Sequence, residues 1–280
     1  CLHRRAHAST PMKRQSPAGS RKARSGPKTI VLIPSFNTGA ILENVVKEAL
    51  SVHPDVWLLI DGSTDQSHQP LESIRSQNTG LRITVFPKNE GKGSTLLKGA
   101  ILAKSQGFSH FISMDADGQH PASHIPSLLK AVQGNPDALI MGQPVFDQSA
   151  PKIRLWGRKL TLMMTDIETG FGGLGDTLYG FRAYPIDPFL KAFAATSHAR
   201  GYDFDPEIAV RLFWDGLRPV QVSIPVRYID ASEGGVSHFH YLRDNIKLTF
   251  LHFRLIPEGI YRRTMNTMRG MVPRTPFPKT

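Results

Sequence analysis

Short apolar runs alternate with amphipathic stretches along the first half of the chain. The apolar runs are rich in Val, Ile and Leu, and they predict strands at residues 29–34, 56–60, 82–86, 110–114 and 138–142. The stretches between them have helical spacing and predict helices at residues 41–52, 71–77, 94–106 and 123–133. Regular alternation of strand and helix with short loops is typical of an α/β fold, in which helices cover both faces of a mostly parallel sheet.

A polar cluster follows each of the first four predicted strands. The clusters are Ser35-Phe36-Asn37, Asp61-Gly62-Ser63-Thr64-Asp65, residues 88–93 and residues 115–120. In a mostly parallel sheet the carboxyl ends of these strands lie at one edge, where ligands of such folds bind. The sequence therefore predicts one site built from four loops.

The most acidic of these clusters begins where the apolar run 111–114 stops at Asp115 and Asp117. Alternate residues of an extended segment point the same way, so the two carboxylates can aim at one point. Converging carboxylates repel each other unless a cation lies between them, and Mg2+ or Mn2+ with oxygen ligands would keep open positions for a substrate diphosphate. Taken alone, Asp-x-Asp is more often an ordinary turn with solvated acids.

Lys92 lies in a glycine loop, residues 89–94, at the start of a predicted helix. Free N–H groups and the helix dipole favour an anion there, although an ordinary glycine turn is an equally good interpretation of the loop alone. The loop is not a Walker motif, because Lys92 is followed by Gly93 instead of Ser or Thr. No G-x-G-x-x-G follows the first strand, which disfavours a dinucleotide-binding fold.

Charge is distributed unevenly along the 280 residues. The formal net charge is +11, but residues 1–28 contain eight Lys or Arg and no acid, which leaves +3 for the rest. We expect residues 1–28 to be a disordered basic tail. No basic stripe with interleaved aromatic residues runs through the remainder, so no nucleic-acid partner is expected.

The single cysteine, Cys1, rules out an intrachain disulfide and a thiolate metal site. A reducing, cytoplasmic setting is the expectation that follows from this. No apolar run of 18 or more residues occurs, so no membrane span is predicted.

The motifs, in this order, resemble those of the family 2 glycosyltransferases, and most closely the dolichyl- or polyprenyl-phosphate mannose and glucose synthases. The first half supplies Pro-x-Phe-Asn, Asp-Gly-Ser-Thr-Asp, Asn-x-Gly-Lys-Gly and Asp-x-Asp-x-Gln-His-Pro. The second half adds residues 176–182, 201–208, 224–228 and 235–239. The resemblance implies a GT-A fold: a Rossmann-like, mostly parallel sheet flanked by helices, with a C-terminal extension on the acceptor side.

The resemblance also implies a division of the chain. A glycosyltransferase domain would cover residues 29–255, followed by a C-terminal tail at residues 256–280. Within the domain, residues 29–145 would form the nucleotide-sugar half and residues 146–255 the acceptor half.

Individual residues receive roles from the same resemblance. The nucleotide sugar would be bound by Pro34, Phe36, Asn37, Asp61, Lys92, Asp115, Arg154 and Arg182. Mg2+ or Mn2+ would be held by Asp115, Asp117 and Gln119, and the acceptor by Arg227, Ser237 and His238. The chain has Ile60 where the family often has a second acid, and Thr38 where its pattern has Glu, which leaves the nucleotide open between UDP and GDP.

Asp117 and Asp176 are the predicted catalytic residues. In this family Asp176 would face the acceptor, as a general base if the acceptor is a hydroxyl and as a positioning group if it is a lipid phosphate. Arg158 is a further candidate for a phosphate contact or else an exposed helix residue. Glu207 is a candidate site residue or else a cap of the helix predicted at residues 206–214.

The function implied is an inverting, metal-dependent transfer of a hexose from a UDP- or GDP-sugar to a polyprenyl phosphate or another lipid-linked acceptor. One alternative is transfer to a hydroxyl of a glycolipid or polysaccharide. Another is a sugar-1-phosphate nucleotidyltransferase, which would need a Gly-rich basic signature where residues 35–38 stand.

The segment 241–256 has a broad apolar arc with Arg243, Lys247 and Arg254 between its apolar residues. It predicts peripheral contact with anionic headgroups, or else a plain core helix.

Overall fold

A computed structural model describes residues 26–146, 152–201, 203–226 and 241–268, with only the backbone described for residues 152–156 and 241–245. The strands are β1 (Thr29–Ser35), β2 (Val56–Asp61), β3 (Leu81–Phe86), β4 (His110–Ser113), β5 (Ala138–Val145), β6 (Arg182–Pro185) and β7 (Arg218–Pro225). The α-helices are α1 (Ile41–Val52), α2 (Leu71–Gln77), α3 (Lys92–Ser105), α4 (Ile125–Gly134), α5 (Lys152–Thr169), α6 (Ile186–Ala194), α7 (Phe204–Trp214) and α8 (Tyr241–Met268). A short 3-10 helix (Ala122–His124) leads into α4, so the helix predicted from residue 123 begins as a tighter turn.

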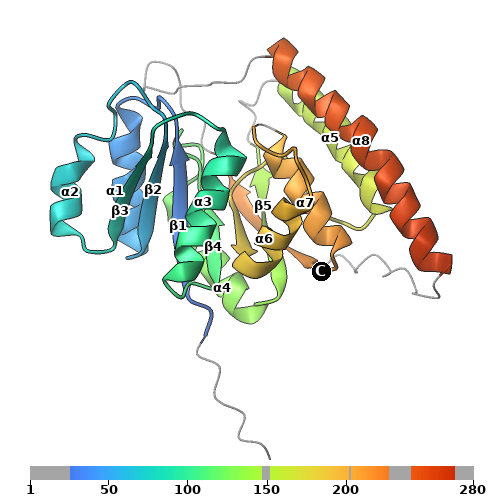
Figure 1. Ribbon diagram of the computed structural model, residues 1–280, viewed down its shortest axis with the longest axis horizontal. Coiled ribbons are helices and arrows are strands. Elements are labelled where there is room, and N and C mark those ends of the chain that lie inside the picture. The colour runs from blue at the N-terminus through green and yellow to red at the C-terminus, as the bar shows by residue number, and fades with distance from the viewer. Residues whose placement is uncertain (1–25, 147–151, 202, 227–240, 269–280) are drawn as a thin grey trace, which may run out of the picture.

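The strands form one seven-stranded sheet in the order β3-β2-β1-β4-β6-β5-β7 (Figure 1). All neighbouring pairs are parallel except those of β6, which runs antiparallel to β4 and β5. The prediction of a mostly parallel sheet is therefore confirmed. Each of the five predicted strands is present, with its ends within three residues of the predicted ones.

Both faces of the sheet are buried, which explains why its strands are continuous apolar runs. Helices α3, α6 and α7 cover one face, and α1 and α4 cover the other (Figure 1). Successive residues of β1 alternate between the two cores, with Ile30 and Leu32 in one and Val31 and Ile33 in the other. Because side chains of a strand point to alternate faces, each residue of such a strand must be apolar to fill both cores.

Helices α5 and α8 lie side by side beyond one end of the sheet (Figure 1). Their close approach requires Gly259, because a Cβ there would lie 2.4 Å from the carbonyl oxygen of Glu168 on α5. Helix α8 continues to Met268, although residues 256–280 were predicted to be a tail. Within the described part of the chain, no helix combines the length and the apolar character needed to cross a bilayer.

Glu207 on α7 anchors α8. It is completely buried, and its carboxylate accepts hydrogen bonds from Arg254 (2.5 and 2.9 Å), Arg211 (2.8 Å) and Thr196 (2.6 Å). Burial alone would raise the pKa of Glu207, but these hydrogen bonds lower it overall. The prediction that Glu207 caps its helix is therefore wrong, because the side chain points into an ionic cluster between helices. Arg254 belongs to this cluster as well, so it does not meet headgroups as expected.

Candidate active site

The loops after β1, β2 and β3 are tied together by two side chains. The Asn37 Oδ1 accepts hydrogen bonds from the backbone N–H groups of Thr64 (2.7 Å) and Asp65 (3.3 Å). The Asp61 carboxylate, which is buried, accepts from the N–H groups of Glu90 (3.0 Å) and Gly91 (2.8 Å). The predicted nucleotide-binding residues Asn37 and Asp61 thus lie at the edge of the sheet, and both oxygens of Asp61 hold the glycine loop.

Gly91 brings a further segment against this edge. It has a φ of 89°, and a Cβ on it would lie 2.2 Å from the carbonyl oxygen of Arg200. The same carbonyl accepts a hydrogen bond from the N–H of Gly93 (3.0 Å). The loop that precedes α7 therefore packs directly on the start of α3, and only glycine at position 91 permits this approach.

The acidic motif after β4 is held by His120. The backbone N–H of Asp115 donates to the His120 Nδ1 (2.9 Å), and the imidazole stacks on Phe181 with 5.0 Å between ring centroids. Burial lowers the pKa of His120 to about 4, so the ring is neutral and its proton lies on Nε2, 3.7 Å from the Asp115 Oδ2. His120 belongs to the predicted motif but had no predicted role, because its contact with the Asp115 backbone forms only in the folded turn.

Asp117 lies beside Asp115. Its Oδ1 accepts a hydrogen bond from the Gln119 N–H (3.0 Å). Burial and the charge of Asp115 raise the pKa of Asp117 to about 6. The charge of one acid of the motif is therefore felt by the other, and their convergence on one metal ion stays a prediction.

Lys92 reaches this motif from the start of α3. Its Nζ lies 2.7 Å from the Asp115 Oδ1 and 2.7 Å from the Asp205 Oδ2, where Asp205 belongs to the first turn of α7. Asp205 was not among the predicted site residues. Its position in the motif 201–208 was the only signal for it in the sequence.

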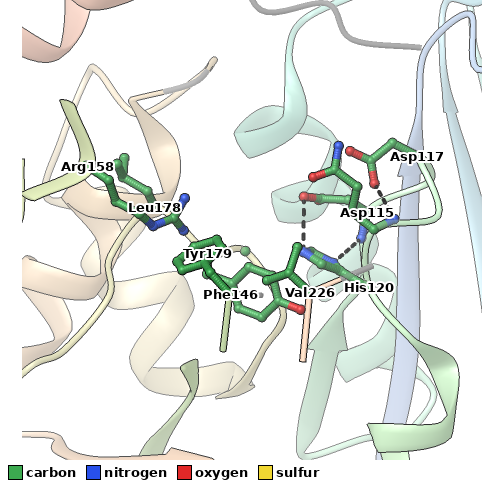
Figure 2. Close-up of a pocket in the computed structure, with 10 residues that line it drawn as sticks. Asp115, Asp117, His120, Phe146, Arg158, Leu178, Tyr179 and Val226 are labelled. Carbon is green, nitrogen blue, oxygen red and sulfur yellow. Dashed lines mark hydrogen bonds and ion pairs between the residues drawn. The ribbon is translucent and has the colours of Figure 1, made fainter. Parts of the chain in front are cut away.

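A pocket of about 130 Å³ opens beside the acidic motif. Figure 2 shows Asp115, Asp117 and His120 toward one side of this pocket, and Arg158, Leu178 and Tyr179 toward the other. Gln119 and Gly180 also line it. The pocket therefore brings together the end of β4, helix α5 and the segment before β6.

Arg158 and Asp176 form a bidentate ion pair at this pocket. The Arg158 Nε contacts the Asp176 Oδ2, and its Nη2 donates to the Oδ1 at 3.0 Å. The same Oδ1 accepts from the N–H groups of Leu178 (2.9 Å) and Tyr179 (3.1 Å). The side chains of Arg158 and Asp176 are only 22% and 6% exposed, so Arg158 is not the free surface residue that we offered as its alternative. The Asp176 Oδ1 thus accepts three hydrogen bonds and its Oδ2 contacts Arg158, and the choice between base and positioning group stays a prediction.

Arg182 does not lie where we predicted it. It is completely buried, and its guanidinium donates to the carbonyl oxygens of Asp205 (2.6 Å), Tyr179 (2.8 Å) and Asp176 (3.4 Å). A guanidinium held in this way cannot reach a phosphate without leaving the core. Arg182 therefore fixes the backbone around the pocket, and the predicted phosphate contact is wrong for this structure.

Several predicted residues fall outside the described part of the structure. These are the side chain of Arg154 and the acceptor residues Arg227, Ser237 and His238. Pro34 and Phe36 are described and lie at the carboxyl end of β1. The roles of all six stay predictions.

The residues of the acidic motif fit a divalent cation. Asp115, Asp117 and Gln119 all line the pocket with oxygen donors of the kind that Mg2+ and Mn2+ prefer. Burial and the charge of Asp115 raise the pKa of Asp117, and a cation would relieve both effects. Among the described residues, no group of three or more His, Cys, Asp or Glu side chains is placed to hold a metal ion.

Comparisons with known proteins agree with this geometry. Residues 30–205 match the model of Glycosyl transferase family 2. The polyprenol monophosphomannose synthase of Mycolicibacterium smegmatis is 28% identical over 275 residues, which cover 94% of this chain and 99% of that protein. A dolichyl-phosphate beta-glucosyltransferase of Trichomonas vaginalis is 23% identical over 225 residues, or 74% of this chain and 68% of that protein.

A solved structure supports the fold. The glucosyl-3-phosphoglycerate synthase of Mycobacterium tuberculosis, in complex with Mn2+, UDP-glucose and phosphoglyceric acid, superposes with a TM-score of 0.58 at 17% identity. The alignment covers 84% of this chain and 80% of that one. The predicted GT-A architecture is thereby confirmed.

Proposed function

Because the chain belongs to glycosyl transferase family 2 and is a glycosyltransferase, we propose that it transfers a hexose from a nucleotide sugar to a polyprenyl phosphate, with inversion and with the help of Mg2+ or Mn2+. The observation that carries the proposal is the pocket in which the acid pair Asp115 and Asp117 faces the cationic Arg158. Membership in this family sets aside the sugar-1-phosphate nucleotidyltransferase alternative.

The leaving group explains the charge distribution in the pocket. A nucleoside diphosphate leaves with negative charge that must be neutralised as the sugar C1–O bond breaks. A divalent ion held by Asp115, Asp117 and Gln119 would supply that neutralisation and the Lewis acidity. Arg158, which is paired with Asp176, lies on the facing side of the pocket, where it would contact a second anionic group.

The state of Asp176 supports a phosphate acceptor over a hydroxyl acceptor. A hydroxyl must lose a proton as it attacks, and Asp176 was the predicted base. Its carboxylate instead receives Arg158 and two backbone N–H groups. A lipid phosphate is already anionic and needs no base, which agrees with the similarity to the polyprenol monophosphomannose synthase of Mycolicibacterium smegmatis.

The proposal is tested by transfer to a short-chain polyprenyl phosphate from UDP-glucose, GDP-mannose and UDP-GlcNAc, each with Mn2+ and with chelator. We expect one donor to yield a glycosyl phosphoprenol by mass spectrometry only when Mn2+ is present. Asp117→Asn should lower the rate by roughly 100-fold or more. The matched control is Asp187→Asn, because Asp187 is a highly exposed aspartate on α6. Full activity of Asp117→Asn would overturn the assignment of the acid pair.

Helix α8 supports contact with the membrane that would carry such an acceptor. Six of its apolar side chains are between 50% and 75% exposed, and most are three, four or seven residues apart: Ile246, Phe250, Phe253, Ile260, Tyr261 and Met268. That spacing places them on one face, while Leu248, Leu251 and Leu255 are buried on the opposite face. The outward face therefore carries exposed apolar side chains from Ile246 to Met268, beyond the segment 241–256 expected from sequence, and exposed Lys247 beside it suits anionic headgroups.

Flotation with anionic vesicles tests this contact. We expect the full chain to float with the vesicles and the double variant Phe250→Glu, Phe253→Glu to stay in the soluble fraction. Ile101→Glu is the control, because Ile101 is a half-exposed apolar residue on another helix, α3. If the wild-type chain does not bind the vesicles, the membrane contact is refuted.

A further inference from the structure

Lys92 pairs with Asp115, one of the proposed metal ligands. Its ammonium group is 2.7 Å from one oxygen of Asp115 and 2.7 Å from one oxygen of Asp205. The three side chains come from α3, the end of β4 and α7, and Lys92 and Asp205 are 113 residues apart in the sequence. Lys92 therefore bridges Asp115, a proposed metal ligand, and Asp205, which had no predicted role.

The surrounding backbone fits closely around this ion cluster. A Cβ on Gly180 would lie 2.4 Å from the Lys92 Nζ and 3.2 Å from both an Asp115 oxygen and an Asp205 oxygen. The carbonyl of Asp205 is also held by the buried guanidinium of Arg182. A side chain at position 180 would therefore collide with the Lys92 ammonium group.

Only one of the two carboxylate oxygens of Asp205 has a hydrogen-bond partner among the described residues. Its Oδ2 accepts the Lys92 ammonium, whereas its Oδ1 is buried and has no hydrogen-bond partner among the described residues. A buried carboxylate oxygen without a partner is costly, so a stronger interaction with a cation would be favourable. Burial alone would lower the pKa of Lys92, but Asp115 and Asp205 raise it overall, so the side chain stays charged.

We infer that Lys92 is a built-in counter-cation, which neutralises Asp115 before the divalent ion binds and is then held by Asp205 when that ion takes over Asp115. The inference rests on the proposed function, because it assumes that Asp115 is a metal ligand. Asp205 is then a positioning residue that acts through Lys92. The exchange keeps the negative charge of the acidic motif neutralised at each stage, and it leaves Lys92 beside the incoming diphosphate.

Mn2+ affinity of the full-length protein, measured without nucleotide from the EPR signal of free Mn2+, tests the exchange directly. Lys92→Gln removes the competing charge and should bind Mn2+ about tenfold more tightly or better, because two unit charges a few Å apart interact strongly at a partly buried site. Asp205→Asn leaves Lys92 to Asp115 alone and should bind Mn2+ several-fold more weakly. Lys98→Gln is the matched control, since this lysine of α3 pairs with Glu90 away from the acid motif, and its affinity should equal that of the wild type.

The double variant separates the exchange from simple charge addition. If Asp205 acts through Lys92, the weakening caused by Asp205→Asn should disappear in the Lys92→Gln background. Equal weakening in both backgrounds, or unchanged Mn2+ affinity in Lys92→Gln, would overturn the inference. A wild-type chain that binds no Mn2+ with or without UDP would instead refute the metal dependence in the proposed function. Thermal unfolding without metal checks that each variant is folded.

Discussion

The ion pair between Arg158 and Asp176 allows the role of Asp176 to be decided. If Asp176 only holds Arg158 toward the pocket, Asp176→Asn removes the charge while the amide oxygen can still accept from the N–H groups of Leu178 and Tyr179. The loop should keep its shape, and Arg158 should lose its fixed direction. If Asp176 were a general base, the same change would remove a chemical step.

The size of the effect follows from the geometry. Two hydrogen bonds between charged groups join the pair, and both side chains are mostly buried. A hydrogen bond to a charged group contributes about 1.5–3 kcal/mol, so loss of the fixed arginine should lower kcat/KM by roughly 10- to 150-fold. Arg158→Ala should cost at least as much, because it removes the positive charge that Asp176 holds in place.

A double-mutant cycle on kcat/KM for transfer to polyprenyl phosphate measures whether the two residues act as one unit. We expect the double variant Arg158→Ala, Asp176→Asn to be no worse than Arg158→Ala alone. Losses that multiply in the double variant would show that Asp176 works independently of Arg158, and our reasoning would be refuted. Thermal unfolding of all three variants controls for damage to the fold.

Three further predictions concern the residues that hold the site in place. Glu207→Gln should lower the free energy of unfolding by about 3–5 kcal/mol at pH 7, because it leaves two arginines without their buried partner. Burial raises the pKa of Glu207, but its hydrogen bonds lower it overall. The contribution of Glu207 to the free energy of unfolding is therefore present above the carboxyl's ordinary pKa of 4.5 and is lost on acidification. Urea unfolding should show a smaller loss of stability from Glu207→Gln at pH 4 than at pH 7. Arg182→Lys should reduce the thermal midpoint even without substrate, because a lysine cannot serve three carbonyls, whereas a lost phosphate contact would raise KM alone. Gly180→Ala should lower kcat/KM by tenfold or more through the displaced Lys92, while Gly134→Ala, where a Cβ meets nothing within 4 Å, should leave it unchanged.

The arrangement of strands and helices was readable from the chain because it depends on local periodicity. Strands buried on both faces need continuous apolar runs, and helices between them need one apolar face, so the elements of the first half could be placed to within three residues. The rule that parallel strands present their carboxyl ends at one edge then placed Asn37, Asp61, Lys92 and Asp115 near one another. All four lie at that edge in the structure.

The partner of each side chain was not readable, because partners are chosen by packing between distant segments. Arg182 stands in a motif that suggests an exposed arginine, yet β6 lies inside the sheet and its side chain is enclosed by carbonyl groups. Asp176 suggested a base until its ion pair with Arg158 on α5 was seen. The amino-acid sequence gives residue types and their spacing, but it does not show which hydrogen-bonding group will lie opposite a given side chain in the fold.

The α/β class, the edge at which the polar loops gather, the acid pair and the family could be read from the chain alone, since each follows from local periodicity or from motifs within a few residues. The tertiary structure alone decided that Lys92 bridges Asp115 and Asp205, that Arg182 is internal and that α8 presents an apolar face outward. The physical reason is that charge pairing and burial depend on distances across the fold, and folding brings together groups that lie up to a hundred or more residues apart.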